Sequence, residues 1–510
     1  MRLLWIDYLI VACYLLGMIV VGRLLGRRVH TARGYFLAGR AMPFWAVGMS
    51  LVACDIGTTD LVGLTGDAYR HGLSIANFDW IGSFPAMIVA ALIFIPFYWR
   101  AGVYTVPEFL GRRYSPAVRT LLAAVWVALL AFQIGGVFGA VGTVVRDIVG
   151  GGEGTFWAGI FAAALVIGAY ATTGGLSAIV LTDVVQLVIM YTGCLAILIV
   201  GLSEVGGISG LRERIAAIPG TAQQFELIVP AGPHTPVPWP GVLFGLALVM
   251  APSYYIGSQN IVQPALTAKD EWSAKAAILV GAVLKALVPV LLVTPGLIAL
   301  ALYGRGIADK DETFPTLVKN LLPPGMAGLM LAAFFAATIS NIDSMMNGAA
   351  TLFTKDIFQR HLRPAATDAE LLLAGRVVSA VTLLAGVATA KLSVGGLYEY
   401  VQTLYSYVQG PTFAILVLGI FWRRCTAAAG LWGFIAGVAV AVFLHLGHRS
   451  AALGPIFTIE EPFLYVSFWS FAFSLLACAA ITPFTRPHDD ERLRGLVYGL
   501  VLAEPEAPRA

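Results

Sequence analysis

Long apolar runs recur along the whole chain, and they constrain its fold more than any other feature. Thirteen runs that are long enough to cross a bilayer lie between residues 5 and 482. Charged residues make up 12% of the chain, whereas soluble domains carry about 25%. Backbone polar groups in lipid must find partners inside the protein, which favours helices. The sequence therefore predicts an all-α polytopic membrane protein with about 13 transmembrane helices.

Basic residues in the connections indicate how these helices are oriented. If the N-terminus is outside, 21 Lys and Arg residues lie on the inner side and 10 on the outer side. This bias favours an N-terminus outside and a C-terminus inside. The predicted spans are 5–22, 43–65, 76–99, 116–147, 154–172, 177–203, 238–264, 274–303, 325–354, 371–390, 395–421, 426–446 and 462–482.

Polar residues interrupt the second span near its middle, where Asp55, Gly57 and Asp60 fall close together. A carboxylate at the centre of a spanning helix costs roughly 2.5–3.5 kcal/mol on insertion scales, so it normally faces a partner or a wet cavity. A helix that breaks there also frees backbone carbonyls that can bind a cation. We interpret the interruption as half of an ion and solute site. The alternative is a polar kink that packs against a neighbouring helix.

A second interruption lies five spans later, around Gly257 and Ser258 in the seventh span. Two interrupted helices at matching positions of two five-helix halves indicate an inverted-repeat transporter, with its site between the repeats. The broken helix would be the first of each repeat. We therefore predict one transmembrane domain, 1–482, followed by a short cytoplasmic tail, 483–510. Its inverted repeats would cover about 43–204 and 238–421, with peripheral helices at 5–22, 426–446 and 462–482.

Other polar residues inside predicted spans are candidates for binding. Ala337, Ser340 and Asn341 share one helical face in the ninth span. Hydroxyl and amide oxygens suit a hard cation such as Na⁺, although small residues on one face also serve helix packing. Asp183 in the sixth span would line an ion path or would bond to a neighbouring helix end. Lys285 in the eighth span would point into a cavity or pair with an acid.

Two further residues have equally open interpretations. Asp79 begins the third span and would be either an interfacial acid or an acceptor for solute hydroxyls. Gln402 in the eleventh span would bond to solute or hold two helices together.

Several classes of function lack support in the sequence. The chain contains no P-loop, no HExxH metal motif and no nucleophile–base arrangement, so we predict that it is not an enzyme. Without a nucleotide-binding module, any pumping would draw on an ion gradient. We expect a small solute and membrane lipids as partners, no nucleic acid and no obligatory protein partner.

Six stretches taken together resemble the sodium:solute symporter family, which includes the sodium/glucose cotransporters and the proline permeases. The resemblance implies the LeuT-type inverted-repeat fold and Na⁺ as the coupling ion. The stretches are SLVACDIGTTDLVGLTGDAYRHGL (50–73), IPFYWRAGVYTVPEFLGRRY (95–114), ATTGGLSAIVLTDVVQ (171–186), GSQNIVQPALTAK (257–269), AATISNIDSMMNGAATLFTKDIF (336–358) and LGIFWRRCTAAAGLWGFIAG (418–437).

The same resemblance implies roles for particular residues. The family's sodium site falls on the carbonyls of Ala53 and Ile56 and on Ala337, Ser340 and Asn341, where Asn341 departs from the usual Ser or Thr hydroxyl. Asp55 and Asp183 would lie along the ion path. Predicted solute residues are Asp60, Asp79, Ser258, Gln259, Lys285 and Gln402.

These observations predict a sodium-coupled secondary active symporter that imports a small polar organic solute, preferably a sugar or polyol, by alternating access. A sodium- or proton-coupled carrier of amino acids or other small metabolites is the alternative within transport. A membrane sensor without net transport is the alternative from another class. We expect a multi-pass protein of the cell membrane, the bacterial inner membrane in particular.

Overall fold

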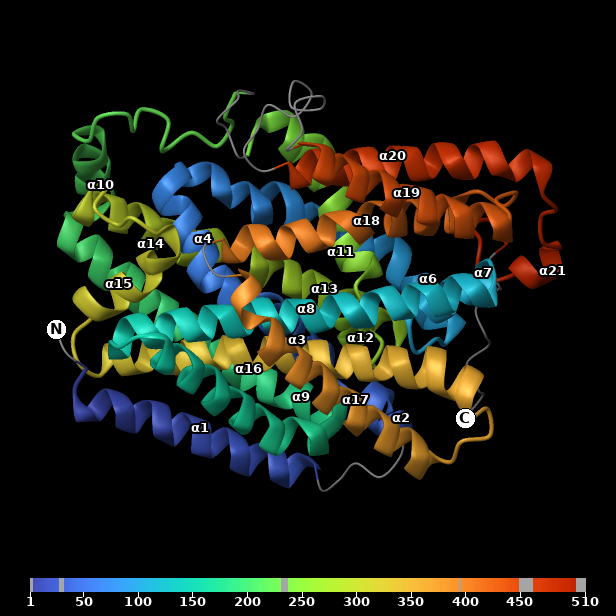
Figure 1. Cartoon of the computed structure of the whole chain (residues 1–510), viewed down its shortest axis with the longest axis horizontal. Helices are drawn as coiled ribbons and strands as arrows, with labels where there is room; N and C mark the ends of the chain where they lie inside the picture. The colour runs from blue at the N-terminus through green and yellow to red at the C-terminus, as the bar shows by residue number, and fades with distance from the viewer. Residues whose placement is uncertain (1–2, 27–31, 231–236, 394–395, 449–461, 501–510) are drawn as a thin grey trace.

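The computed structural model describes residues 3–26, 32–230, 237–393, 396–448 and 462–500, and the side chains of residues 22, 23, 25, 26, 32, 33 and 170–175 lie outside this description. The described part is helical and has no β-strand, apart from one isolated backbone bridge between Met42 and Ala268. Most long helices run along the longest axis of the molecule (Figure 1). The last residues of the predicted tail, 501–510, fall outside the description.

The long helices and their bounds follow the predicted spans. Their ends lie at caps or breaks, for example at Ser115, whose side chain accepts a hydrogen bond from the Val118 N–H. The α-helices of the described residues are α1 (Trp5–Gly26), α2 (Ala32–Leu37), α3 (Phe44–Asp55), α4 (Thr58–His71), α5 (Phe84–Val89), α6 (Ile95–Ala101), α7 (Val106–Arg113), α8 (Pro116–Val149), α9 (Glu153–Val205), α10 (Gly207–Ala216), α11 (Ala251–Gly257), α12 (Gln259–Ala265), α13 (Glu271–Lys285), α14 (Val288–Tyr303), α15 (Thr313–Asn320), α16 (Met326–Leu352), α17 (Asp368–Thr389), α18 (Leu397–Phe421), α19 (Ala427–His448), α20 (Phe463–Ile481) and α21 (Asp490–Leu493).

Tighter or wider helical turns extend several of these helices. Some of them continue a span, as η3 does between Asn77 and α5. These segments are η1 (Ala38–Arg40), η2 (Gly72–Ala76), η3 (Phe78–Ser83), η4 (Ala90–Phe94), η5 (Gly241–Met250), η6 (Lys310–Glu312), η7 (Phe353–Leu362), η8 (Ala390–Ser393) and η9 (Thr482–Phe484).

Two spans are broken, at the two places where the sequence predicts interruptions. The pair Phe44–Asp55 and Thr58–Ala76 bends by 60°, and the pair Gly241–Gly257 and Gln259–Ala265 bends by 58°. Nine further helices of the described residues are long and apolar enough to cross a membrane, and two shorter apolar helices cover Trp5–Val21 and Glu153–Ala169. Each of the thirteen predicted runs therefore coincides with an apolar helix or a bent pair.

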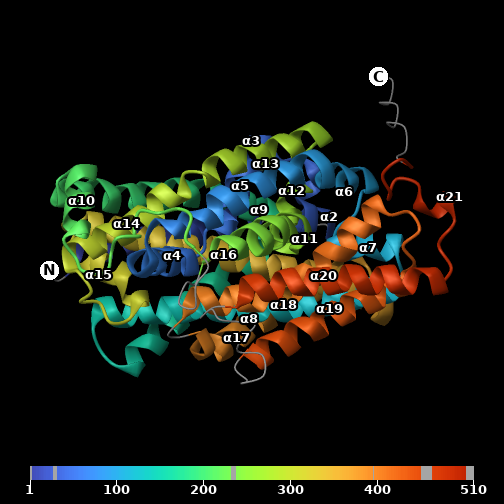
Figure 2. The ribbon, with the colours of Figure 1, turned by 90° about the horizontal axis from the view of Figure 1, so that it is seen from above.

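Burial separates a central group of helices from a peripheral one. In the span Met326–Leu362, which contains α16, 83% of the most apolar window is buried, against 33% in α19 and in the span that contains α20. Helix α16 packs against α9, α8 and α1, whereas α19 packs mainly on α20 and α18. Figure 2 shows α19 and α20 along one side of the bundle, with α16 deep inside it. The interior position of α16 places its polar face against the first broken span.

The start of α1 and the short helix α21 lie at opposite ends of the long axis (Figure 1). An odd number of crossings would produce this arrangement. Which end faces the cytoplasm remains a prediction from the charge bias.

Candidate functional site

The first break leaves two backbone carbonyls without their helical donors. In an uninterrupted helix the Ala53 carbonyl would accept from the Gly57 N–H, and the Ile56 carbonyl from the Asp60 N–H. Instead, the Gly57 N–H donates to Asp60 Oδ2 at 2.7 Å, and the Asp60 N–H bonds to the Gly57 carbonyl at 3.1 Å. Both carbonyls are therefore available to a ligand, and they are the two that the sequence resemblance assigns to Na⁺.

Helix α16 faces this break with hydroxyl and amide groups. The Asn341 Nδ2 donates to the Cys54 carbonyl at 2.7 Å, while Asn341 Oδ1 is buried and has no hydrogen-bond partner in the described structure. Thr338 and Thr58 share a hydroxyl hydrogen bond of 2.7 Å. A buried oxygen without a partner is costly unless a ligand completes it. Together with the two free carbonyls, Asn341 Oδ1 forms an oxygen-rich surface that fits a hard cation such as Na⁺.

Asp183 adjoins the same group from α9. Its Oδ1 accepts from the Ser340 hydroxyl at 2.6 Å, and its Oδ2 accepts from the Ser50 hydroxyl at 2.5 Å and from the Cys54 thiol at 3.2 Å. Asp183 is fully buried. The carboxylate thus links the broken span, α9 and α16, and it is in direct contact with Ser340.

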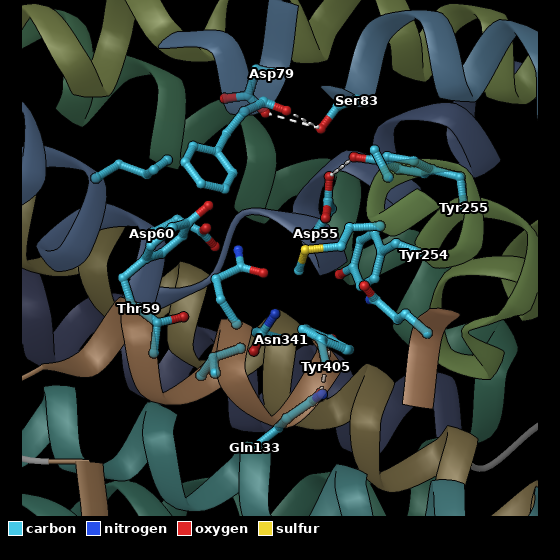
Figure 3. Close-up of a pocket in the computed structure, with 18 of the residues that line it drawn as sticks. Asp55, Thr59, Asp60, Asp79, Ser83, Gln133, Tyr254, Tyr255, Asn341 and Tyr405 are labelled. Carbon is cyan, nitrogen blue, oxygen red and sulfur yellow. Dashed lines mark hydrogen bonds between the residues drawn. The ribbon is translucent and has the colours of Figure 1, made fainter. Parts of the chain in front are cut away.

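An interior cavity of about 90 Å³ adjoins the broken span. Figure 3 shows Asp79 and Ser83 on one side of it, Gln133 and Tyr405 on the opposite side, and Asn341 between them. This volume lies below the range of about 300–1,000 Å³ that is common for small-molecule sites, so a ring-sized solute requires the cavity to widen. The cavity is lined by Asp55, Thr59, Asp60, Leu64, Phe78, Asp79, Ser83, Gln133, Val137, Leu246, Met250, Ala251, Tyr254, Tyr255, Lys285, Asn341, Met345, Tyr398, Val401, Gln402, Tyr405 and Gln409.

One lysine and two carboxylates form a buried cluster in the cavity wall. Lys285 Nζ lies 2.9 Å from Asp55 Oδ2 and 3.3 Å from Asp79 Oδ1, and each of the three side chains is about 5% exposed. The Tyr255 hydroxyl also donates to Asp55 Oδ2 at 2.7 Å. The cluster joins α13, α3 and η3, so Lys285 both points into the cavity and pairs with acids.

An aromatic pair closes one end of the cavity. The rings of Phe78 and Tyr398 meet edge to face with centroids 5.2 Å apart. Both residues also line a smaller recess beyond them, which contains Asp67 and Glu399. Lys310 from η6 forms ion pairs with Asp67, at 2.5 Å, and with Glu399. The aromatic pair of Phe78 and Tyr398 therefore separates the cavity from the recess, where Lys310 bridges two acids.

The structure groups most, but not all, of the predicted site residues. Asp55, Asp60, Asp79, Lys285 and Gln402 line the cavity. Ala53, Ile56, Ala337, Ser340, Asn341 and Asp183 lie at or near the first break, on α3, α16 and α9.

Ser258 and Gln259 at the second break lie apart from the cavity lining. The Gln259 side chain accepts from the Val106 N–H at 3.1 Å and donates to the Tyr104 carbonyl at 3.0 Å. The buried Ser258 hydroxyl has no hydrogen-bond partner in the described structure. A solute role for these two residues stays a prediction without support from the cavity.

Two amides in the cavity wall were not identified from the sequence. Gln133 Oε1 accepts from the Tyr405 hydroxyl at 3.0 Å, while Gln133 Nε2 and Gln409 Oε1 have no partner in the described structure. Gln402, Tyr405 and Gln409 are spaced three and four residues apart, so they share one face of α18. That spacing was the signal for Gln409. Gln133 stands alone in an apolar helix and had no such signal.

The model of the sodium:solute symporter family matches residues 35–437. The sodium/glucose cotransporter of Vibrio parahaemolyticus is 30% identical, over 96% of this chain and 92% of that protein. The human sodium/myo-inositol cotransporter 2 is 30% identical, over 96% of this chain and 78% of that protein. A substrate-bound, outward-open Na⁺-coupled sialic acid symporter has the same fold, with a TM-score of 0.83 at 21% identity, covering 95% of this chain and 99% of that one.

Proposed function

Since this chain belongs to the sodium:solute symporter family, we propose that it imports a sugar or polyol together with Na⁺ by alternating access. The protein is a multi-pass membrane transporter rather than an enzyme. The two relatives are named for glucose and for myo-inositol, which are both polyhydroxylated rings. Amides and aromatic rings in the cavity wall suit such a solute, because hydroxyls bond to amides and ring faces stack on aromatics.

The observation that carries the proposal is the position of Asn341. Its amide nitrogen bonds to the Cys54 carbonyl at the first break, and the same side chain lines the solute cavity. A cation at the free carbonyls of Ala53 and Ile56 would therefore be one side chain away from the solute. Coupling requires that each ligand raise the affinity for the other by the same factor. A Na⁺ ion that moves through 100 mV contributes about 2.3 kcal/mol to this cycle.

The proposal includes the placement of the chain in the membrane. The repeats would cover about 43–204 and 238–421, with one broken span each, and the N-terminus would be outside. The protein would lie in the cell membrane, in bacteria the inner membrane, surrounded by lipids and without an obligatory protein partner.

Thermal stability of the purified, reconstituted protein tests the proposal. We expect a sugar or polyol to raise the melting temperature in Na⁺ and not in K⁺ at the same ionic strength. A set of sugars, polyols and amino acids measured in both salts would identify the solute class and the ion together. Absence of any Na⁺-dependent stabilisation across the set would contradict the proposal.

Proton coupling is the second candidate, because a buried carboxylate contacts the predicted ion site. Asp183 accepts the Ser340 hydroxyl at 2.6 Å, so a proton on this acid would change a group next to the first break. Thermal stabilisation by solute that depends on pH and does not depend on Na⁺ would favour this candidate. We then expect Asp183→Asn to abolish the pH dependence.

A further inference from the structure

The charge of the solute cavity is unusual for a site that would take a neutral ring. Among the described residues, its charged lining consists of Asp55, Asp60, Asp79 and Lys285. Three carboxylates thus face one ammonium group, a formal excess of two negative charges. Asp55 and Asp79 are 7% exposed or less, where water compensates a charge poorly, and Asp60 is partly buried in the cavity wall. The excess therefore calls for cationic partners.

Lys285 is already engaged by two of the three carboxylates. Its Nζ lies 2.9 Å from Asp55 and 3.3 Å from Asp79. Tyr255 and Ser83 add hydroxyl donors to these two acids, at 2.7 Å and 3.3 Å. The ammonium group cannot leave them for a solute without uncovering a buried charge, which is costly. Lys285 therefore organises this wall and leaves the third carboxylate to another partner.

Asp60 is that third carboxylate. One of its oxygens accepts the Gly57 N–H at 2.7 Å and thereby caps the N-terminus of α4. In the described structure no Lys, Arg or His lies within ion-pair distance of it. The helix terminus supplies only about half a positive charge. A Na⁺ ion at the first break would also lie near the buried Asp183, so the cavity would retain at least one formal negative charge.

The rest of the cavity wall indicates what else the partner would carry. Gln133 Nε2 and Gln409 Oε1 lack partners in the described structure and could bond to hydroxyls. Tyr254 packs edge to face on Tyr405 with centroids 5.2 Å apart, which presents aromatic surface for a ring. A cation also interacts favourably with such rings.

We propose that the transported solute is a polyhydroxylated amine, an amino sugar or an aminocyclitol, whose ammonium group binds Asp60. This inference rests on the proposed Na⁺-coupled symport and specifies its substrate class. The amine would neutralise negative charge that remains in the cavity after Na⁺ binds. A neutral sugar would leave Asp60 without a counter-ion in the cavity.

The test compares solutes that differ at one group. Glucosamine, glucose and N-acetylglucosamine share a ring, and only glucosamine carries an ammonium group at a pH where its amine is protonated. We expect glucosamine to stabilise the reconstituted protein against heat in Na⁺ at a concentration at least about tenfold lower than either neutral solute, which corresponds to about 1.4 kcal/mol. Asp60→Asn should bring the ratio between the stabilising concentrations of the neutral solutes and of glucosamine toward one.

A matched variant controls for the loss of a carboxylate. Asp270 is about half exposed, caps α13 through the Ser273 N–H at 2.6 Å, and is not among the residues that line the cavity. Asparagine caps helices as well as aspartate does, so Asp270→Asn should keep the preference for the amine. Loss of the preference in both variants to the same degree would overturn the role of Asp60.

Charge movement gives a second readout that does not depend on a variant. In proteoliposomes, uptake of the amine should move one more elementary charge per solute than uptake of a neutral ring. If neutral rings bind in Na⁺ as tightly as the amine and Asp60→Asn removes a pH dependence instead, Asp60 carries a proton. That result overturns this inference and leaves Na⁺ symport standing. If no solute responds to Na⁺, the proposed function fails, and this inference fails with it.

Discussion

The two broken spans bend alike, but the groups around them differ. They bend by 60° and 58° and would begin the two proposed repeats. At the first break, the carbonyls of Ala53 and Ile56 lack their helical donors. At the second, the Ile256 carbonyl accepts the Tyr98 hydroxyl at 3.0 Å. A protein hydroxyl thus bonds to the Ile256 carbonyl at the second break, whereas the carbonyls of Ala53 and Ile56 at the first are available to a ligand.

The side chains at the two breaks also differ. The first break carries Asp55 and Asp60, and both face the cavity. The second carries Gln259, which bonds to the backbone of Tyr104 and Val106 and so fastens α12 to the start of α7. A repeated backbone therefore does not imply a repeated site. The chemistry depends on which neighbouring groups reach the freed backbone, and these differ between the halves.

The largest expected effect comes from Lys285→Ala. The change leaves Asp55 and Asp79 buried without a cation, and such breakage costs about 3–5 kcal/mol. We expect solute affinity to fall by about 100-fold or more and the Na⁺ response to fall much less, measured by thermal titration with each ligand. The control is Lys275→Ala, which removes a partly exposed pair with Glu271 at 3.0 Å and should change neither titration. Equal losses for ion and solute in Lys285→Ala would show that the lysine is structural.

For Asn341→Ala we expect a smaller effect, which is similar for the Na⁺ affinity and the solute affinity. This side chain contacts the first break and lines the cavity. We expect the apparent affinities for Na⁺ and for solute to fall together, each by about tenfold, because linkage makes the coupling reciprocal. The two titrations, each repeated with and without the other ligand, measure this coupling. A change in one affinity alone would place Asn341 in only one of the two sites.

Gln259→Ala should affect stability and leave coupling intact. The change removes two hydrogen bonds to buried backbone groups at Tyr104 and Val106, a cost of about 1–3 kcal/mol. The melting temperature without ligands should fall. The Na⁺ concentration for half-maximal stabilisation by solute should stay within about twofold, a difference of about 0.4 kcal/mol. A large shift in that concentration would mean that the second break also binds a ligand.

Much of the architecture follows from the sequence, because each span needs its own apolar run. The two breaks were visible as polar interruptions, and the acids and Lys285 stood out because charge is rare in such runs. Partners across the fold were not visible. Tyr98, which bonds to the Ile256 carbonyl at the second break, is one tyrosine among many, and its role is visible only when the third span packs against α11. The family resemblance implied a solute role for Ser258 and Gln259, and this role stays a prediction, because neither residue is among those that line the cavity.

A matched pair of serine variants tests the central claim most directly. Ser340→Ala removes a hydroxyl at the first break, whereas Ser258→Ala removes a buried hydroxyl at the second that has no partner in the described structure. The measurement is a Na⁺ titration of solute-induced thermal stabilisation in the reconstituted protein. We predict that Ser340→Ala raises the required Na⁺ concentration by about tenfold, or about 1.4 kcal/mol, and that Ser258→Ala leaves it unchanged. Equal shifts in the two variants, or a shift in Ser258→Ala alone, would contradict the assignment of the ion to the first break.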